Sequence, residues 1–130
     1  MRWLANLLAA LAIAAFGVVP ASAQEVVRSK QDKTSLGLIS ERAAVAPGDL
    51  FLVAANFDLD EDGWHVYWKN PGDSGLPPEV RKWTLPEGVE AGGFKWPAPH
   101  AIPLATLMNY GYEHELVLPF EVNVPATAKP

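Results

Sequence analysis

Apolar and polar residues alternate along two long stretches of the sequence, residues 50–59 and 116–124. In the first stretch, one face carries Phe51, Val53, Ala55, Phe57 and Leu59. In the second stretch, one face carries Leu116, Leu118, Phe120, Val122 and Val124. Pro119 cannot donate to a sheet ladder, which indicates that the second stretch lies at a sheet edge or contains a bulge. Because a two-residue period places alternate side chains on opposite faces, both stretches predict strands with one face in a core.

Shorter stretches between Pro- and Gly-rich turns predict further strands, at residues 34–42, 64–69, 79–84 and 94–96. No segment beyond residue 23 shows the i, i+3, i+4, i+7 spacing of a helix over a useful length. This pattern predicts an all-β fold, an immunoglobulin-like antiparallel β-sandwich. Such a sandwich has about seven strands. Only five or six are counted here. We therefore expect the last strand or strands to be missing and the chain to be the front part of a longer protein.

The first 23 residues have the three parts of a cleavable secretory signal peptide. Arg2 gives a positively charged start, residues 4–19 are almost wholly apolar, and Ala21-Ser22-Ala23 ends the segment with small residues. The apolar run is shorter than the ~20 residues that a membrane-spanning helix needs. An uncleaved membrane anchor is the alternative, and no other segment is long and apolar enough to span a bilayer. We therefore expect export from the cytoplasm by a cleaved signal peptide, residues 1–23.

The rest of the chain divides into three parts. Residues 24–33 are polar and charged without a period, which predicts a flexible N-terminal lead. Residues 34–124 contain all the expected strands and are predicted to form the immunoglobulin-like domain. Residues 125–130 are expected to be a tail or a truncated linker.

The formal net charge of −5 argues against a nucleic-acid or anionic-membrane partner, because no basic patch is present to neutralise phosphates. Part of the acidic charge lies in one turn, at Asp58, Asp60, Glu61 and Asp62. A solvated turn is the favoured interpretation of this cluster, and a bound cation is the alternative.

Several kinds of chemistry are missing from the sequence. The chain contains no cysteine, which removes thiol exchange and zinc–thiolate sites and leaves the core to hold by packing. Asp73 and Ser74 lie in a Gly-rich loop, but this loop lacks the Gly-x-Ser-x-Gly spacing of a hydrolase. There is no phosphate loop or dinucleotide fingerprint. We therefore predict no cofactor and no catalytic residue within this chain.

Four motifs are dense in aromatic residues, proline and glycine. They are residues 63–77 (GWHVYWKNPGDSGLP), 83–88 (WTLPEG), 96–99 (WPAP) and 109–113 (NYGYE). Tryptophan and tyrosine bury a large apolar area but need a hydrogen-bond partner, and glycine allows backbone angles that other residues avoid. Such a set predicts a rigid loop geometry or a docking surface. The residues expected to build it are Gly63, Trp64, His65, Trp68, Asn70, Pro71, Gly72, Gly75, Trp96, Asn109 and Gly111.

The four motifs resemble the N-terminal periplasmic domain of the thiol:disulfide interchange protein DsbD family. The likeness is greatest to the branch that includes the suppressor-of-copper-sensitivity membrane reductases. It covers roughly residues 36–124, and the first motif is its specific part. The resemblance implies an immunoglobulin-like fold and a periplasmic location. It also implies electron transfer from a transmembrane domain, supplied through a thioredoxin-like domain, to partners such as disulfide isomerases or cytochrome c maturation proteins.

One requirement of that activity is absent from this chain. The family transfers electrons through a cysteine pair in this domain, and a thiolate is needed to attack a disulfide sulfur. Since the chain has no cysteine, no catalytic residue carries over. The favoured interpretation places the redox cysteines beyond Pro130 in a longer protein. The alternatives are a non-catalytic exported protein-binding module and, less favoured, a periplasmic copper-binding protein.

Candidate contact residues come from the aromatic motifs. Tyr67, Tyr110 and Tyr112 are expected to dock a protein partner, because aromatic residues are enriched at interface hot spots. Trp64 and Trp68 share a strand face with Val66 and are expected in the core. The residues that could bind copper are scattered without ligand spacing, so no metal site is predicted; they are His65, His100, His114 and Met108.

Overall fold

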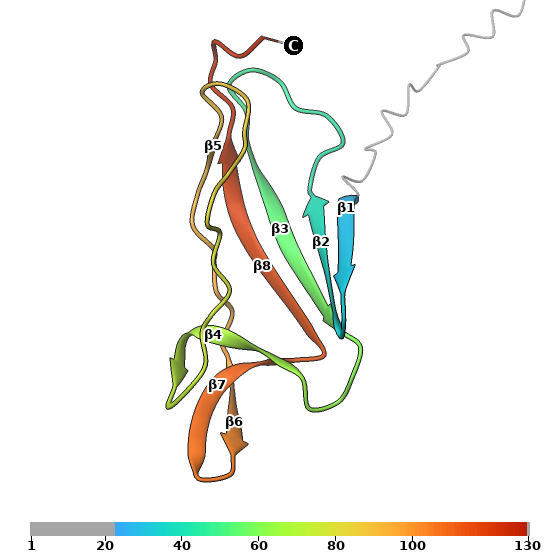
Figure 1. Ribbon diagram of the computed structural model, residues 1–130. Helices are drawn as coiled ribbons and strands as arrows, with labels where there is room; N and C mark the ends of the chain where they lie inside the picture. The colour runs from blue at the N-terminus through green and yellow to red at the C-terminus, as the bar shows by residue number, and fades with distance from the viewer. Residues whose placement is uncertain (1–22, 130) are drawn as a thin grey trace, which may run out of the picture.

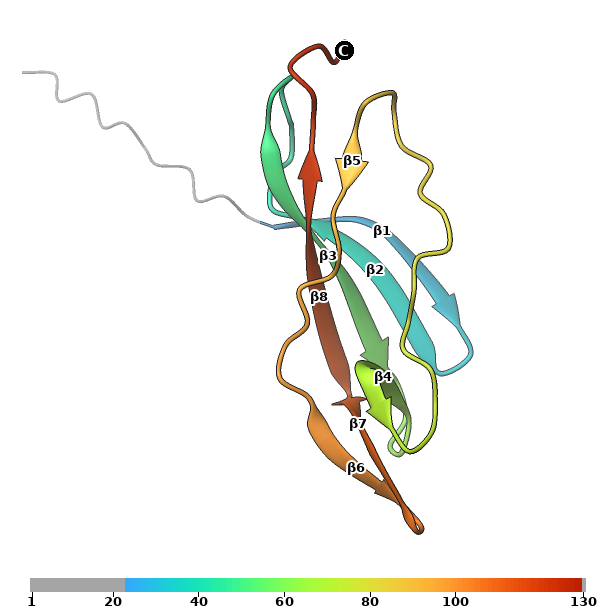
Figure 2. The ribbon, with the colours of Figure 1, turned by 90° about the vertical axis from the view of Figure 1, so that its left-hand side faces the viewer.

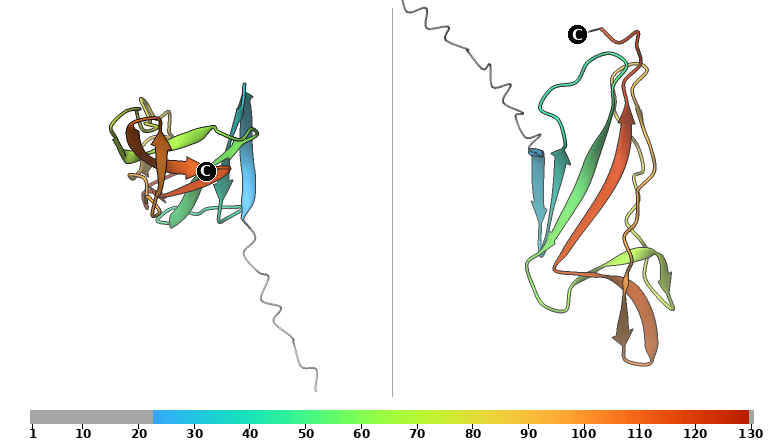
Figure 3. Two further views of the ribbon diagram at one scale, coloured as in Figure 1. Left: turned by 90° about the horizontal axis from the view of Figure 1, so that it is seen from below. Right: turned by 180° about the vertical axis from the view of Figure 1, so that it is seen from behind.

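The computed structural model describes residues 23–129, which form two antiparallel β-sheets (Figure 1). The strands are β1 (Gln24–Gln31), β2 (Thr34–Ser40), β3 (Leu50–Leu59), β4 (His65–Gly72), β5 (Glu90–Ala91), β6 (His100–Leu104), β7 (Leu107–Glu113) and β8 (Glu115–Asn123). The larger sheet has the order β1-β2-β3-β8-β5, and the smaller has the order β4-β7-β6. Seen from behind, the smaller sheet lies at one end of the larger (Figure 3). The expected all-β immunoglobulin-like sandwich is confirmed.

Strands β3 and β8 form the centre of the larger sheet, in register from Leu50 opposite Asn123 to Asp58 opposite Glu115. Their alternating apolar residues face the second layer. Ala55, Leu116 and Leu118 form a buried cluster with Tyr112 of β7. Burying these side chains removes apolar surface from water, which stabilises the folded state by about 25 cal/mol per Å² of buried surface. The two stretches with the clearest alternation therefore form the core.

The backbone of Pro119 faces the side of β8 that is opposite β3. On that side β8 is bordered only by the short strand β5 and by an irregular segment. Gly92 N donates to Glu121 O at 2.8 Å, and Lys95 N donates to Pro119 O at 2.7 Å. Because these bonds use carbonyls of β8, the proline costs the sheet no ladder bond there. The expected edge position is not found, since β8 lies between β3 and β5, but an irregular segment borders the strand at Pro119.

The segment predicted to be a flexible lead, residues 24–33, instead forms β1 and its turn. β1 pairs with β2 from Gln24 opposite Ser40 to Gln31 opposite Thr34. Three ion pairs join this hairpin to the acidic turn, and they are Arg28–Asp58, Lys30–Asp60 and Lys33–Glu61. Pairing with a neighbouring strand and with opposite charges orders a segment that has no apolar period of its own. The acidic turn is thus partly neutralised by cations of the same chain.

Residues 79–84 and 94–96, which were predicted to be strands, are irregular. They belong to a long connection, residues 73–99, that crosses the open face of the larger sheet and includes only the two-residue strand β5 (Figure 2). We call this connection the strap. Its aromatic rings pack on the sandwich, although its backbone pairs with a strand only at β5. The ring centroid of Phe120 lies 5.2 Å from that of Trp83 and 5.8 Å from that of Phe94. The apolar residues of the strap therefore mark contacts with the sheet and not the alternation of a strand.

The expected signal peptide, residues 1–23, lies almost wholly outside the described residues. Within residues 23–129 there is no helix, and so none that is long and apolar enough to cross a membrane.

Candidate docking site

The loop that follows β4 is clamped to the hairpin of β6 and β7 by two reciprocal pairs of residues. Asp73 N donates to Met108 O at 3.0 Å, and Met108 N donates to an Asp73 carboxylate oxygen at 2.7 Å. Ser74 N and Ser74 Oγ both bond the Asn109 carboxamide oxygen, at 2.9 and 3.2 Å. Asn109 Nδ2 donates to Ser74 Oγ at 3.0 Å. The motifs at 63–77 and 109–113 are therefore one structural unit.

Asn109 is the centre of this clamp. Its side chain is fully buried, in a strand whose neighbours Met108 and Tyr110 are exposed. A buried amide without partners is costly, and here both its oxygen and its nitrogen are bonded to Ser74. The residue therefore fixes the loop through satisfied polar contacts in an otherwise apolar interior.

Two glycines let the loop lie this close to the sheet. Gly72 and Gly75 both have φ of +91°, a region that residues with a Cβ rarely adopt. A Cβ at Gly72 would overlap the carbonyl of Met108, and a Cβ at Gly75 would overlap the ring of Tyr67. The loop geometry thus depends on glycine both for its backbone angles and for space.

The side chain of Tyr67 supports this loop by packing against Gly75. Its half-buried ring lies against Gly75 and meets the ring of His65 edge-on, with centroids 4.6 Å apart. β4 carries a register shift between Tyr67 and Gly72, so residues 68–71 bulge from the ladder. Asn70 and Pro71, expected in the scaffold, lie in this bulge. The bulge turns the chain from the sheet into the clamped loop.

Trp64 and Trp68 do not share one environment, although the sequence pattern put both in the core. Trp68 packs against the buried cluster, as expected. Trp64 is 49% exposed and lies before β4, next to the β1–β2 turn. It follows Gly63, whose φ is +85° at the end of the acidic turn. A turn, not the strand period, decides where Trp64 points.

Tyr112 was expected to contact a partner, and this prediction is wrong. The residue is only 4% exposed, and its hydroxyl donates to Pro97 O at 2.8 Å. Its ring stacks on Trp96 at 6.5 Å, and burial raises the pKa of the Tyr112 hydroxyl. Trp96 and Pro97 of the third motif thus tie the strap to β7. Gly111 is also buried, opposite Tyr67 in β4 and His100 in β6.

Large apolar side chains are exposed on the clamped segments. Leu76, at the tip of the loop, is 85% exposed, and Tyr110 is 39% exposed. Leu107 and Met108 of the hairpin are each 42% exposed. Of these four residues, only Tyr110 was expected at a contact surface from the sequence. For Leu76 a signal existed, because a lone leucine between Gly75 and Pro77 cannot belong to a strand face.

These segments offer contact surface, not reactive groups. Within residues 23–129, no three His, Cys, Asp or Glu side chains form a group that could hold a metal ion. The hydrogen-bonding groups of Asp73, Ser74 and Asn109 are used by the clamp. What remains exposed is apolar and held by a rigid backbone, which suits protein docking because little conformational freedom is lost on binding.

The chain was compared with known proteins. Residues 36–130 match the family described as thiol:disulfide interchange protein DsbD, N-terminal. Among solved structures, the chain is similar to the N-terminal periplasmic domain of ScsB from Proteus mirabilis, with 21% sequence identity and a TM-score of 0.60. The likeness covers 83% of this chain and 41% of that chain, so this protein spans less than half of its length. The search of curated proteins found no match.

Proposed function

Because the chain belongs to the family of N-terminal domains of DsbD-type thiol:disulfide interchange proteins, we propose that it serves a thiol:disulfide reductase. In this role it is the exported N-terminal domain that helps pass reducing equivalents to periplasmic protein partners. The observation that carries the proposal is the family match over residues 36–130, which includes the whole clamp between the loop and the hairpin. The expected signal peptide supports export.

The redox chemistry itself requires cysteines outside this chain, which contains none. A thiolate of the reductase attacks the partner's disulfide, forms a mixed disulfide and releases one partner thiolate, which takes up a proton. A second reductase thiolate then resolves the mixed disulfide. The reductase ends with a disulfide and the partner with two thiols, so two electrons pass from one to the other. The partners are periplasmic thiol-disulfide proteins and the reductase's own transmembrane and thioredoxin-like domains.

The contribution of this chain is to hold the partner in position. The proposed contact surface consists of the exposed side chains on the clamped segments, with Tyr67 behind them; they are Leu76, Leu107, Met108 and Tyr110. Aromatic residues and methionine are enriched in interface centres. A rigid loop that presents such residues next to a disulfide would raise the local concentration of the reacting sulfurs.

The first test is to sequence the gene past the codon for Pro130. We expect the frame to continue into a segment with a cysteine pair and then into apolar spans. Alkylation of cell extracts with maleimide-polyethylene glycol then reports the redox state of that pair and of a periplasmic disulfide isomerase. A stop codon at that position would overturn the redox role and leave the docking module.

The second test separates docking from chemistry in the full-length reductase. Leu76→Asp places a charge on the proposed surface, and Leu50→Asp places the same charge at an exposed position of the larger sheet. We expect L76D to lower the reduced fraction of the disulfide isomerase at least about tenfold, which corresponds to ~1.4 kcal/mol. L50D should leave that fraction unchanged. Equal effects of the two substitutions would show that the loop is not the docking surface.

A further inference from the structure

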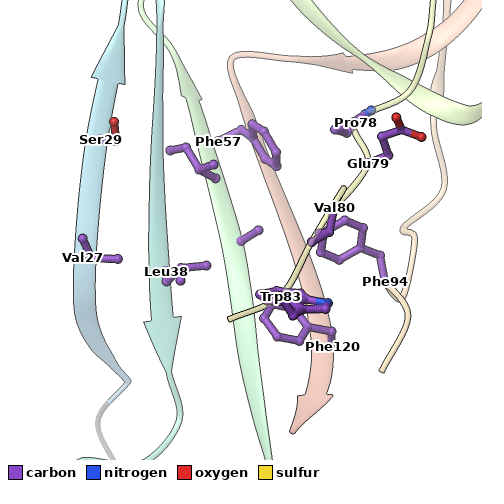
Figure 4. Close-up of a pocket in the computed structure, with 12 residues that line it drawn as sticks. Val27, Ser29, Leu38, Phe57, Pro78, Glu79, Val80, Trp83, Phe94 and Phe120 are labelled. Carbon is purple, nitrogen blue, oxygen red and sulfur yellow. The ribbon is translucent and has the colours of Figure 1, made fainter. Parts of the chain in front are cut away.

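An apolar groove lies between the inner face of the larger sheet and the strap. It consists of three adjoining cavities of about 300, 350 and 370 Å³. Figure 4 shows the first cavity, with Leu38 and Phe57 on one side and Val80 and Phe94 on the other. Neighbouring cavities share lining residues, which are Leu38, Trp83 and Phe120 for the first and second, and Val45, Phe51 and Val122 for the second and third. The three cavities therefore follow one another along β3 and β8.

The groove exposes contiguous apolar surface. In the first cavity Val27, Leu36, Val80 and Trp83 are each more than a third exposed. Apolar surface of this kind marks a binding site on soluble proteins. Ordered water does not suit such a site, because each buried water needs about two to four polar partners. Each cavity also has the volume of a small-molecule pocket, which is about 300–1,000 Å³.

The polar groups in the middle of the groove are already bonded to each other. Ser40 Oγ donates to Arg42 O at 2.8 Å and accepts from Arg42 N at 3.2 Å, and the Arg42 guanidinium lies 3.1 Å from an Asp49 carboxylate oxygen. Two other charged residues line the groove, Glu79 in the first cavity and Lys129 in the third. Neither forms an ion pair within residues 23–129. The groove is thus apolar along its length, with an acidic end and a basic end.

This environment fits a hydrocarbon chain better than a polypeptide. The floor of the groove consists of side chains of β2, β3 and β8, whose backbone groups are paired with one another in the sheet. A peptide lying on this floor would bury amide groups that find no partner there, which is costly. A hydrocarbon chain has no such groups and gains free energy from every methylene that leaves water.

We propose that the groove binds a single-chain anionic amphiphile, of the class of long-chain fatty acids. The hydrocarbon chain lies along the inner face of β3 between Phe51 and Phe57, over about 20 Å, which is close to the length of extended palmitate. The carboxylate lies at the end of the groove that carries Lys129, because Lys129 attracts it and Glu79 repels it. The inference goes beyond the proposed function, since it requires neither a thiol nor the clamped loop.

The test is calorimetric titration of the exported protein with palmitate below its critical micelle concentration. We expect saturable binding of one palmitate per chain. Octanoate should bind at least about 100-fold more weakly, because it buries fewer methylenes. Hexadecyltrimethylammonium has a chain of the same length and a cationic head, and it should bind at least about threefold more weakly than palmitate. Absence of saturable palmitate binding, or equal affinities for palmitate and octanoate, would overturn the proposal.

A matched pair of substitutions locates the site. Val27→Glu places a charge in the wall of the first cavity, and Val117→Glu places the same charge on the opposite face of the larger sheet; both positions are exposed in the native protein. We expect V27E to weaken palmitate binding at least about tenfold and V117E to leave it unchanged. Equal effects would show that palmitate binds elsewhere and would refute the proposal.

Two further measurements test the head group and the occupant. Lys129→Gln should weaken palmitate binding about threefold and should not weaken the binding of hexadecyltrimethylammonium. Loss of affinity for both amphiphiles would contradict the proposed position of the carboxylate. If light scattering shows a dimer that palmitate does not dissociate, and that V27E does dissociate, a second copy of the chain occupies the groove and the proposal is wrong.

Discussion

The side chain of Asn109 joins two segments that lie 35 residues apart in the sequence. It bonds the backbone and the hydroxyl of Ser74, while Asp73 and Met108 bond each other beside it. Three of these four residues are polar, so none of the three marks a core position in the sequence. The fourth, Met108, is apolar but exposed. The loop is therefore held by hydrogen bonds.

Replacing Asn109 should destabilise the protein more than its size suggests. Asn109→Ala leaves Ser74 N–H and its hydroxyl without their partner in a buried site, at a cost of about 1–3 kcal/mol in the free energy of unfolding. Asn123→Ala, at an exposed position of β8, is the matched control and should cost less than ~0.5 kcal/mol. Urea unfolding measures both. Similar values for the two variants would show that the clamp contributes nothing.

Gly75 offers a test of space as distinct from backbone angle. Gly75→Ala brings a Cβ into the ring of Tyr67 at a positive φ, whereas Gly63→Ala has a similar φ and nothing within 4 Å. We expect about 1 kcal/mol for G63A, from the backbone alone. The G75A variant should lose a further 1–3 kcal/mol or so from overpacking. If thermal unfolding gives equal losses, Tyr67 does not rest on Gly75.

The strap shows how an element without regular pairing is held in place. Its rings pack on Phe120 and on Tyr112, and its backbone bonds β8 through Gly92 and Lys95. The hydroxyl of Tyr112 donates a hydrogen bond to Pro97 O, a carbonyl in a Pro-rich irregular segment. Because most of the strap forms no ladder with a strand, these side-chain contacts help to hold it on the sandwich.

Removing the Tyr112 hydroxyl should therefore loosen the strap. Tyr112→Phe keeps the stacked ring but leaves Pro97 O without its donor, and we expect a loss of about 1 kcal/mol at pH 7. Tyr110→Phe, at an exposed position of the same strand, should change stability by less than ~0.5 kcal/mol. Urea unfolding at pH 7 measures the difference. Equal stabilities of the two variants would mean that the bond to Pro97 is not formed in solution.

The same residue predicts a dependence on alkaline pH. Burial raises the pKa of Tyr112 above its ordinary value of 10.0 in the folded protein. In the unfolded chain Tyr112 loses its proton near pH 10, while the folded state retains it, so stability falls as the pH rises above 10. Tyr112→Phe lacks this ionisation and should lose less stability between pH 9.5 and about 11. Parallel curves for wild type and variant would contradict the buried hydroxyl.

The whole molecule depends on β8, which carries more of the buried apolar residues than any other strand. Leu116, Leu118, Phe120 and Val122 of this strand are all buried, and Leu118 is fully buried. The neighbouring Val117 lies on the opposite face and is 41% exposed. The molecule is thus a sandwich with one dense end, around Leu118 and Tyr112, and one more open end, where Leu38 and Trp83 line two cavities.

This arrangement predicts a large difference between adjacent positions. Leu118→Ala leaves a cavity in the dense end and should cost about 2–5 kcal/mol. Val117→Ala removes a partly exposed side chain and should cost less than ~1 kcal/mol. Guanidinium unfolding of the exported protein measures both values. A small loss for L118A would show that the core collapses around this site or is not formed there.

Several features of the protein were determined by the sequence alone. Alternation along residues 50–59 and 116–124 identified the two central strands, because the face that loses contact with water must be apolar in any sandwich. The four motifs indicated the family that the match over residues 36–130 shows, and two of them, at 63–77 and 109–113, form the clamped loop. The zero cysteine count excluded thiol chemistry within the chain, since no fold can supply a missing sulfur.

Other features were decided only by the tertiary structure. β1 forms because β2 and the acidic turn lie beside it. The strap is irregular because its aromatic rings pack on the sheet, while its backbone pairs with a strand only at β5. Tyr110 and Tyr112, two residues apart, differ in burial because the hairpin leaves the sandwich between them. Each of these outcomes depends on contacts between residues far apart in the chain. A local period cannot report such contacts, since it records only which face of a segment is apolar.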